Sequence, residues 1–424
     1  MIKHKKLGMA VAGACALLGS TAASAFSLKA GDWDVSFSGD VNAFYTYSHC
    51  DNNARPVVGG IICTTSNQQS NSQVRGGLLP SALVFSAKTQ QEGFDIGVTF
   101  GLYPGINSSA GGIIGANGSG STIGLATSGI DFRQNFFTIG DKDIGTFKLG
   151  RDIGIFGSDA ILSDITIIGV GTTLSPRAPT NTSLGRIGLG YIYTDFSPQI
   201  TYISPNVSGF QGSVGIFQPF DQTGFGAVTL GGPGISASLT GHQTPGVQGK
   251  VTYDYNVAGV TGRTWVGGFY QRTFALAGDT VGVGGATAIA GEAGVKGSVA
   301  GFDAVLYGYY GRGIGTTAFL FDGVAAGGLA NGNRRNSKGG YAQLGYRFGK
   351  WHPVVSYGAS FLDLATSEAP NILVARNRSY GGGVYYSLTK SVTLDVEFFH
   401  NISNNHIGGS NVGNDFSVGG IIFF

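Results

Sequence analysis

The sequence predicts an all-β protein: a transmembrane antiparallel β-barrel of sixteen strands. Three observations lead to this prediction, namely the alternation of the last ten residues, the low content of charged residues and the change between short and long connections. Residues 415–424 place apolar or glycine residues at every second position counting back from Phe424, while Asp415 and Ser417 lie on the other side. A strand inside a bilayer needs a partner for its edge, because every backbone donor and acceptor there must be paired. A closed barrel supplies that partner.

The N-terminal segment has the features of a cleaved signal peptide. Three lysines among the first six residues precede an apolar run over residues 7–18, and a small-residue cleavage site ends at Ala25. We therefore expect residues 1–25 to be removed and residues 26–424 to form a single barrel domain. The alternative is a lipidated N-terminus at Cys15, for which the apolar run would be short.

The composition separates a barrel from other exported proteins. Charged residues make up 12% of the chain and Gly contributes 74 of 424 residues, whereas ordinary soluble domains carry about 25% charged residues. Beyond the signal segment, no apolar run approaches the roughly 18 residues of a membrane helix. The low charge suggests a membrane protein, yet no segment could form a membrane helix. Alternating strands account for both observations, because each strand exposes only every second residue to lipid. Without residues 1–25 the chain has 23 basic and 24 acidic residues, which argues against a nucleic-acid partner.

Alternating segments can be followed along the whole chain, and charged residues fall on one side of each. In residues 391–400, for example, Leu394, Val396 and Phe398 alternate with Asp395 and Glu397. The pattern alone also fits a β-sandwich, and the low charge, the terminal strand and the connections favour the barrel. The sixteen predicted strands are residues 35–47, 79–89, 94–103, 131–140, 145–151, 194–204, 209–217, 247–256, 260–271, 286–298, 302–312, 339–348, 353–363, 379–388, 391–400 and 415–424.

The connections between these strands alternate in length. Residues 90–93, 141–144 and 349–352 are tight turns, whereas residues 104–130 and 313–338 are long polar stretches. Short turns at one end and long loops at the other are typical of outer-membrane barrels, whose short turns face the periplasm. Sixteen strands enclose a lumen wide enough for water, so the sequence predicts a channel.

Cys50 and Cys63 lie in the first polar segment after a strand of an exported protein. The oxidising compartment favours a disulfide between them, and two unpaired thiols are the alternative. Their spacing does not match a zinc site.

Several stretches resemble a known family. Residues 35–48, 132–159 and 197–217 are similar to strands of the general Gram-negative porins, the sixteen-stranded trimeric diffusion channels, and residues 132–151 are the most specific stretch. The resemblance implies an outer-membrane location, a homotrimer and a loop after Arg151 that folds into the lumen and narrows it. It also implies contact with outer-membrane lipid and recognition of the strand that ends at Phe424 by the barrel-assembly machinery.

The resemblance further assigns residues to a pore constriction. Arg133 matches a wall arginine, and Asp159 and Asp164 match acids of the constriction loop, so these groups are expected to face each other across the narrowest point. Arg151 and Asp152, at the start of that loop, are expected there as well. The alternative is that these charges only pair to hold the loop in place.

The sequence departs from the family at three places of this constriction. Asp40 and Ala82 stand where wall bases would be expected, and the later acid of the loop falls near Ile167 or Ile168. We therefore expect a constriction that is less charged and more apolar than in the family. Further charged residues on the polar side of predicted strands are candidate lumen residues; the alternative is that they only keep the inner wall hydrated. They are Lys88, Lys250, Glu292, Lys296, Arg347, Asp395 and Glu397, together with Asp40.

The predicted function is passive diffusion of small hydrophilic solutes and ions, without a cofactor, a metal or an enzymatic reaction. The mature histidines form no H-E-x-x-H motif and no obvious nucleophile arrangement. Two alternatives stay open: a substrate-selective channel, and a surface-interaction barrel with a closed lumen.

Overall fold

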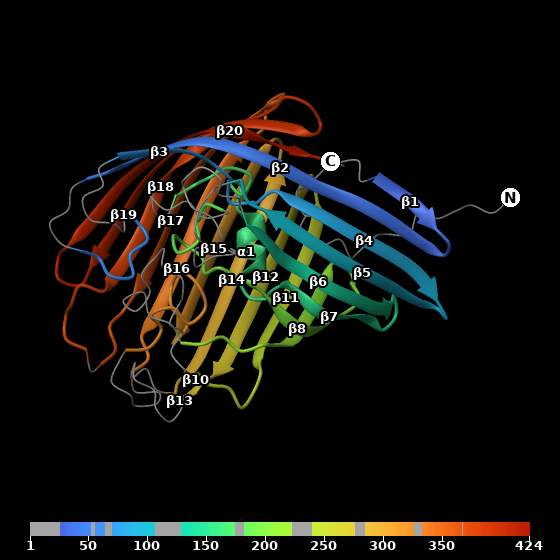
Figure 1. Ribbon diagram of the computed structural model, residues 1–424, viewed down its shortest axis with the longest axis horizontal. Coiled ribbons are helices and arrows are strands. Elements are labelled where there is room, and N and C mark those ends of the chain that lie inside the picture. Colours follow the sequence, from blue (N-terminus) through green and yellow to red (C-terminus); the bar gives the residue numbers. More distant parts are fainter. Residues whose placement is uncertain are drawn as a thin grey trace.

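The computed structural model of the protein describes residues 26–51, 56–63, 70–106, 129–173, 182–222, 240–275, 285–325, 333–366 and 368–424. They form twenty strands and one short helix, arranged around a single barrel (Figure 1). In chain order the elements are β1 (Phe26–Ala30), β2 (Trp33–Cys50), β3 (Ser70–Arg75), β4 (Ala82–Gln91), β5 (Phe94–Pro104), β6 (Ile130–Asp141), β7 (Gly145–Ile153), α1 (Ser158–Ser163), β8 (Phe196–Ile203), β9 (Phe210–Phe217), β10 (Thr240–Gly241), β11 (Gly246–Val257), β12 (Val260–Arg272), β13 (Phe274–Ala275), β14 (Thr287–Val299), β15 (Phe302–Arg312), β16 (Asn336–Tyr346), β17 (Trp351–Leu362), β18 (Val374–Ser387), β19 (Val392–Asn405) and β20 (Ser410–Phe423).

Sixteen of these strands form a closed antiparallel barrel, which confirms the predicted fold class. Each of β2, β4–β9, β11, β12 and β14–β20 pairs with the next, and β20 pairs with β2 to close the ring. Each of the sixteen predicted segments overlaps one of these strands, with bounds that differ by up to five residues. The short strand β1 pairs with the first residues of β2, and β3 pairs with its last residues. The strands β10 and β13 pair with each other in a separate two-stranded sheet.

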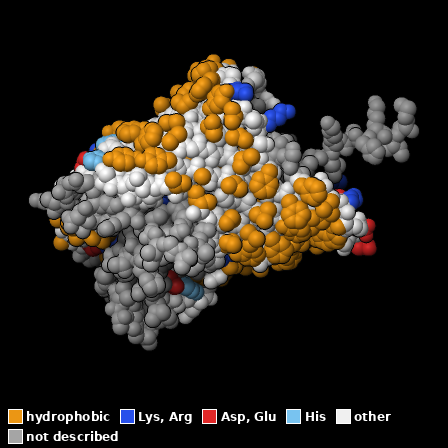
Figure 2. Space-filling model, turned by 45° about the horizontal axis from the view of Figure 1, so that its top comes forward, with side chains coloured by type: hydrophobic (Ala, Val, Ile, Leu, Met, Phe, Trp, Pro, Cys, Tyr) orange, Lys and Arg blue, Asp and Glu red, His pale blue; other side chains and the backbone are white. Residues whose placement is uncertain are grey.

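The alternation in the sequence separates the outer face from the inner face of the barrel. On β19, Leu394, Val396 and Phe398 are exposed on the outside, while Asp395 and Glu397 are buried on the inside. Figure 2 shows the consequence, because hydrophobic side chains gather over the outer surface of the described wall. Among the described residues, no helix is long and apolar enough to cross a membrane.

The end of the chain closes the barrel as its sequence predicts. Phe416, Val418 and Ile422 of β20 face outward, and Asp415 and Ser417 face inward. The backbone N–H and carbonyl of Phe424 bond to the carbonyl and N–H of Gly39 at 3.0 and 2.9 Å. The last strand therefore has no free edge over these residues.

Tight turns join consecutive strands at one end of the barrel. Between β4 and β5, Glu92 and Gly93 both have positive φ, of 50° and 86°. This is the backbone of a two-residue hairpin turn that suits the twist of the strands, and glycine adopts it without a steric penalty.

The inside of the barrel contains a long connection, which we call the inner loop and define as residues 154–173 and 182–195. It runs from the end of β7 through α1 to the opposite wall and back to β8 (Figure 1). Phe156, Ile187, Tyr191 and Ile192 of this loop are fully buried in an apolar cluster. The sequence predicted water-filled space, and the structure fills part of it with this cluster.

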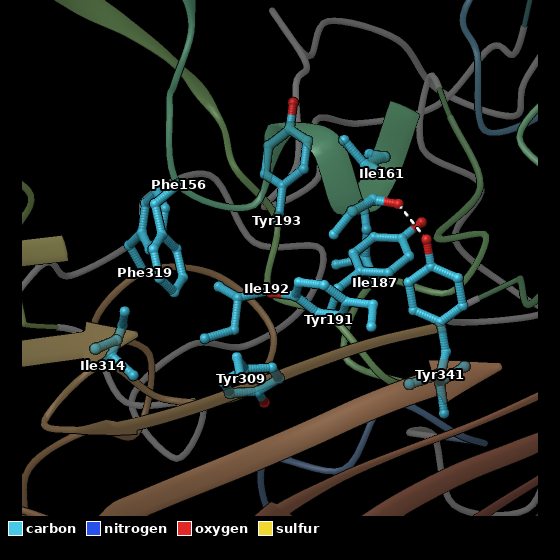
Figure 3. Packing of buried hydrophobic residues seen from close by; sticks show 14 of the residues in the cluster. Phe156, Ile161, Ile187, Tyr191, Ile192, Tyr193, Tyr309, Ile314, Phe319 and Tyr341 are labelled. Carbon is cyan, nitrogen blue, oxygen red and sulfur yellow. Dashed lines mark hydrogen bonds between the residues drawn. The ribbon is translucent and has the colours of Figure 1, made fainter. Parts of the chain in front are cut away.

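The apolar cluster joins the inner loop to the barrel wall. Figure 3 shows Tyr341 of β16 pointing at the loop residues, Tyr309 of β15 below Ile192, and Phe319 beside Phe156. Phe319 lies in the long connection between β15 and β16, so a second loop also folds inward. Such a cluster fixes the inner loop by burial of apolar surface.

Candidate pore constriction

The helix α1 begins at a point held by two wall side chains. The backbone nitrogen of Gly157 lies 3.0 Å from each carboxylate oxygen of Glu292 on β14, and Tyr307 donates to the same carboxylate at 2.8 Å. Gln248 of β11 accepts from the backbone N–H groups of Ile155 and Phe156 at 2.9 Å. These acceptors satisfy donors just before the helix that have no partner within it. Glu292, predicted as a lumen residue, lies on the inner wall but is buried under the loop.

Asp159 in α1 forms ion pairs with cations on two neighbouring strands. Its carboxylate pairs with Lys250 of β11, and Arg263 of β12 approaches to 3.2 Å. Arg263 also lies 2.6 Å from Asp254. Burial alone would raise the pKa of the Asp159 carboxyl, but the two cations outweigh burial and hold this pKa below its ordinary value of 3.8. Asp159 is therefore a charged anchor between loop and wall.

Lys296 completes this cluster from the next strand. It is the direct cross-strand partner of Arg263 on the inner face of β14, and it is only half-buried. Among the described residues, Lys296 forms no ion pair, whereas Lys250 and Arg263 do. The predicted lumen residues Lys250 and Lys296 thus come together with Asp159 and Asp254.

Asp164 ends the helix and is bound by uncharged donors. Tyr191 donates to it at 3.0 Å and Gln343 of β16 at 2.6 Å. Nearby, the Tyr341 hydroxyl donates to the carbonyl of Ala160 at 2.6 Å, the dashed line in Figure 3. Asp164 is 2% exposed, so the structure uses it to hold the loop rather than to line a wet surface.

The far part of the inner loop is held by acids from the opposite wall. Glu397 of β19 accepts from the backbone N–H groups of Val170 and Gly171 at 2.8 Å. Asp415 of β20 accepts from the Thr172 and Thr173 hydroxyls at 3.0 Å. Asp395, the remaining predicted lumen acid on β19, is 3% exposed, and its carboxylate oxygens have no hydrogen-bond partner among the described residues.

Arg186, on the return path of the loop, is a buried cation that the sequence reasoning did not single out. It donates to the carbonyl of Ser379 at 3.2 Å and lies 5.7 Å from the ring of Phe399. Burial lowers the pKa of Arg186, and nearby Asp164 opposes this effect. Nothing in the sequence marks this residue, because its partners come from strands far along the chain.

Arg133 does not face the loop acids that the resemblance assigned to it. It lies 3.0 Å from Asp131, two residues earlier on β6. Its guanidinium sits 5.4 Å from the ring of Tyr103 and 5.7 Å from that of Phe196. The expected pairing across the pore with Asp159 is therefore corrected: Asp159 is neutralised by Lys250 and Arg263 instead.

The structure also corrects the position of Arg151. On β7 this residue is exposed and shares the outer face with Phe147 and Leu149, because the strand alternates strictly up to its end. Asp152 is on the inner face, where Lys148 pairs with it at 2.5 Å and Gln134 donates to it at 2.9 Å. The parity of the last strand residues was the signal that the sequence reasoning did not use.

The other three predicted lumen residues lie away from the inner loop. Asp40 of β2 is buried and accepts from Asn42 at 3.1 Å. Lys88 is exposed near the short-turn end of β4, on the inward parity opposite Gly97. Arg347 follows the end of β16 with a 61% exposed side chain and lies 2.6 Å from Asp303.

Three aliphatic side chains of the inner loop were missed as site residues. Leu162, Ile165 and Ile168 pack against the apolar cluster but remain partly exposed, at every third position of the loop. The sequence signal was the replacement of the expected later acid near Ile167 or Ile168, which predicted an apolar constriction and pointed to Ile168 but not to Leu162 or Ile165.

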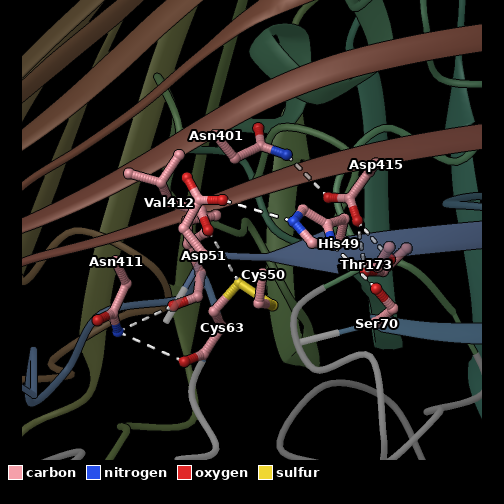
Figure 4. The surroundings of a disulfide bond; sticks show 12 residues. His49, Cys50, Asp51, Cys63, Ser70, Thr173, Asn401, Asn411, Val412 and Asp415 are labelled. Carbon is pink, nitrogen blue, oxygen red and sulfur yellow. Dashed lines mark hydrogen bonds and ion pairs between the residues drawn. A yellow bond between two sulfur atoms is a disulfide. The ribbon is translucent and has the colours of Figure 1, made fainter. Parts of the chain in front are cut away.

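Cys50 and Cys63 are joined by a disulfide in the structure (Figure 4). The bond ties the end of β2 to the segment that contributes Ile61 and Ile62 to the apolar cluster. Asn411 of β20 donates to the carbonyl of Ile62 at 3.2 Å. The disulfide therefore fixes a third inward-folding segment.

The described residues contain no group of three or more His, Cys, Asp or Glu side chains placed to hold a metal ion. Residues 1–25, the predicted signal segment, lie outside the described residues.

Comparison with known proteins identifies the family. A model of the Gram-negative porin family matches residues 10–406. No curated protein gave a significant match. Among solved structures, the outer membrane channel DcaP of Acinetobacter baumannii aligns at 15% identity with a TM-score of 0.65, covering 94% of this chain and 99% of that one.

Two further structures have the same fold. The anion-selective porin from Comamonas acidovorans aligns at 13% identity with a TM-score of 0.57, covering 92% of this chain and 100% of that one. OmpF of Salmonella typhi, solved in complex with daunomycin, aligns at 13% identity with a TM-score of 0.52, covering 94% and 100%. At these identities the likeness concerns the fold alone. The family match extends over nearly the whole chain and agrees with the sixteen-stranded barrel, so this protein belongs to the Gram-negative porin family and is an outer-membrane diffusion channel.

Proposed function

We propose that the protein is a general diffusion channel of weak ion selectivity, whose aperture lies between the inner loop and the wall formed by β4–β8. The observation that carries this proposal is the local pairing of charges. Arg133 pairs with Asp131 on its own strand, and Lys148 pairs with Asp152 four residues on. A transverse field needs opposite charges on opposite sides of the aperture, and paired charges on one side cancel most of it.

The loop side of this aperture is aliphatic in our proposal. Leu162, Ile165 and Ile168 are the partly exposed residues of the stretch 154–173, whereas the acids of that stretch, Asp159 and Asp164, are buried and bound. An aliphatic edge does not discriminate between anions and cations. Permeation is then limited by the size of the solute and by the cost of removing its hydration shell.

Lys296 gives the channel its remaining preference between anions and cations. Together with Lys250 and Arg263 it makes three cations, which face Asp159 and Asp254. Lys296 is half-buried and forms no ion pair with a described residue, so it favours anions slightly, and the related fold of an anion-selective porin is consistent with that direction. We therefore assign Lys296 the role of setting a weak anion preference.

We also propose a homotrimer. The support is the OmpT fold of Vibrio cholerae, solved in a trimer form, which aligns at 11% identity with a TM-score of 0.52. Closed barrels associate through outer surfaces that are largely apolar, as in this chain (Figure 2). Chemical cross-linking in intact outer membranes tests this state, and a protein that remains monomeric under those conditions contradicts it.

One observation favours a second candidate, a barrel with a closed lumen that acts through its surface loops. The apolar cluster joins the inner loop, residues 61–62 and residues 314–320 inside the barrel. If the cluster sealed the lumen, purified protein would give no conductance.

The salt-gradient reversal potential tests the selectivity. We expect an anion-to-cation permeability ratio between about 1 and 3 for potassium chloride, a decrease for Lys296→Glu, and no change for the exposed turn variant Lys142→Glu, whose side chain is 79% exposed. A ratio above about 10 in either direction contradicts weak selectivity.

A further inference from the structure

An apolar groove of about 550 Å³ crosses the outer face of β15–β20. We call it the outer groove, and its side walls are Leu344, Val355, Val384, Val396 and Phe398. All five side chains are at least 40% exposed on the outer face. Because hydrocarbon surrounds this part of the barrel, the groove is a cavity for an apolar chain rather than for water.

Gly382 forms the floor of the outer groove. It pairs with Val355 on β17 and with Phe398 on β19, so a side chain is missing between two large neighbours. A Cβ atom built at this position would lie 2.1 Å from the carbonyl oxygen of Val354. The sheet geometry therefore excludes any larger residue, and the depression is part of the fold.

An aromatic pair lies at the short-turn end of the same two strands. Trp351 and Tyr386 are cross-strand partners with ring centroids 4.5 Å apart. Indole and phenol side chains of this kind sit at the level of lipid headgroups. Gly382 is four residues above Tyr386, which corresponds to about 13 Å along the strand and is close to the depth of one leaflet, roughly half of a 30 Å hydrocarbon core.

Two lysines lie in the short turns next to this aromatic pair. The Lys350 ammonium lies 2.9 Å from the carbonyl of Leu388 and 5.9 Å from the ring centroid of Tyr386. Lys390 is exposed in the neighbouring turn. Neither of these turns, residues 347–350 and 388–391, contains an Asp or Glu. The headgroup level next to the groove is therefore cationic.

We propose that the outer groove and these lysines form a binding site for one anionic phospholipid of the periplasmic leaflet. The phosphate lies between Lys350 and Lys390, the glycerol region lies beside Trp351 and Tyr386, and one acyl chain fills the groove over Gly382. Charge complementarity selects a phosphate with net negative charge. The groove selects a lipid over free phosphate, because only a lipid has a chain to place there.

Native mass spectrometry of the purified, delipidated protein tests this site. Dioleoylphosphatidylglycerol and dioleoylphosphatidylcholine are compared at equal concentration, with and without inorganic phosphate. We expect phosphatidylglycerol to bind at least fivefold more tightly than phosphatidylcholine. The double variant Lys350→Glu/Lys390→Glu loses this preference, whereas Val355→Trp weakens both lipids by filling the groove.

The matched control is Lys142→Glu, a lysine in another short turn without a groove beside it, which should bind within twofold of the wild type. Heat-modifiable gel mobility checks folding, and Lys350→Gln/Lys390→Gln replaces the charge-reversed variant if that variant does not fold. Equal affinity for the two lipids, an unchanged preference in the lysine variants or full displacement of the lipid by phosphate overturns the proposal. Disulfide-linked dimers of Val355→Cys overturn it as well, because a second copy of the chain would then occupy the groove.

Discussion

Glu292 of β14 holds the inner loop by both carboxylate oxygens, each 3.0 Å from the backbone nitrogen of Gly157. The contact joins a residue of the wall to the start of α1 across 135 positions of sequence. It belongs to a series of such contacts, in which Gln248, Gln343 and Glu397 also accept backbone N–H groups of the loop. The path of the inner loop is thus set by acceptors on the wall that bind backbone N–H groups of the loop.

Removal of this acceptor should loosen the loop without opening the barrel. In Glu292→Ala the N–H of Gly157 and the hydroxyl of Tyr307 lose their partner, at a cost of about 1–3 kcal/mol for buried unsatisfied groups. We expect more frequent current interruptions in single-channel recordings and unchanged strand content by circular dichroism. Asp34→Ala, at an exposed site, is the control, and equal noise in both variants contradicts an anchoring role for Glu292.

The ion pairs of Asp159 predict how acid affects the loop. The folded pKa of Asp159 lies below its ordinary value, so its stabilising contribution is present above the unfolded pKa of about 3.9 and is lost as the pH falls through the lower folded value. We expect quiet channels between pH 5 and pH 8 and increased flicker only below about pH 4.

Asp159→Asn should show that flicker at every pH. The substitution leaves Lys250 and Arg263 without their shared carboxylate, which costs about 3 kcal/mol for a largely buried pair. The exposed turn variant Asp143→Asn should behave as the wild type. A flicker that sets in at the same low pH in Asp159→Asn would assign the acid response to another group.

An acidic residue on the lumen side of the inner loop should make the channel selective for cations. Ile165 is partly exposed beside Asp164, so Ile165→Asp adds an unpaired negative charge at the proposed aperture. We expect the permeability ratio in a potassium chloride gradient to shift at least threefold toward cations. Ile144→Asp changes an isoleucine in a short turn and should leave the ratio unchanged; an equal shift in both variants would place Ile165 outside the conducting path.

Reduction of the disulfide should affect one segment and spare the barrel. Cys50–Cys63 closes a loop of 13 positions, and chain-entropy arguments give about 3 kcal/mol for a loop of this size. We expect Cys50→Ser/Cys63→Ser to lower the unfolding temperature while the protein still migrates as a folded barrel on unheated gels. Loss of folded protein in this variant would show that the disulfide is required for assembly.

The wall of the barrel could be predicted from the sequence, and the contents of the lumen could not. Alternation at period two is a local property, so all sixteen strands, the inward Glu397 and the outward Phe398 were predicted correctly. The resemblance to porins was confirmed by the family match. The structure places the inner loop after Arg151, where the resemblance implied it.

The pairing partners inside the lumen depend on contacts between distant strands. Asp159 binds Lys250 and Arg263, about 90 to 100 residues away, and no local pattern encodes this choice. Arg151 was misplaced because family similarity was used where strand parity with Phe147 gave the correct face. The apolar cluster was missed because the loop residues in it follow no periodicity, and their burial against the strand residues follows only from the folded loop path.

Single-channel conductance of the purified, detergent-folded protein in a planar lipid bilayer tests the central claim most directly. Current steps that are linear in voltage, with a small reversal potential of the sign that a weak anion preference gives under a tenfold salt gradient, are the result we predict for an open channel with locally paired charges. A correctly folded barrel that conducts no current, or that conducts with strong preference for one ion sign, would contradict this account.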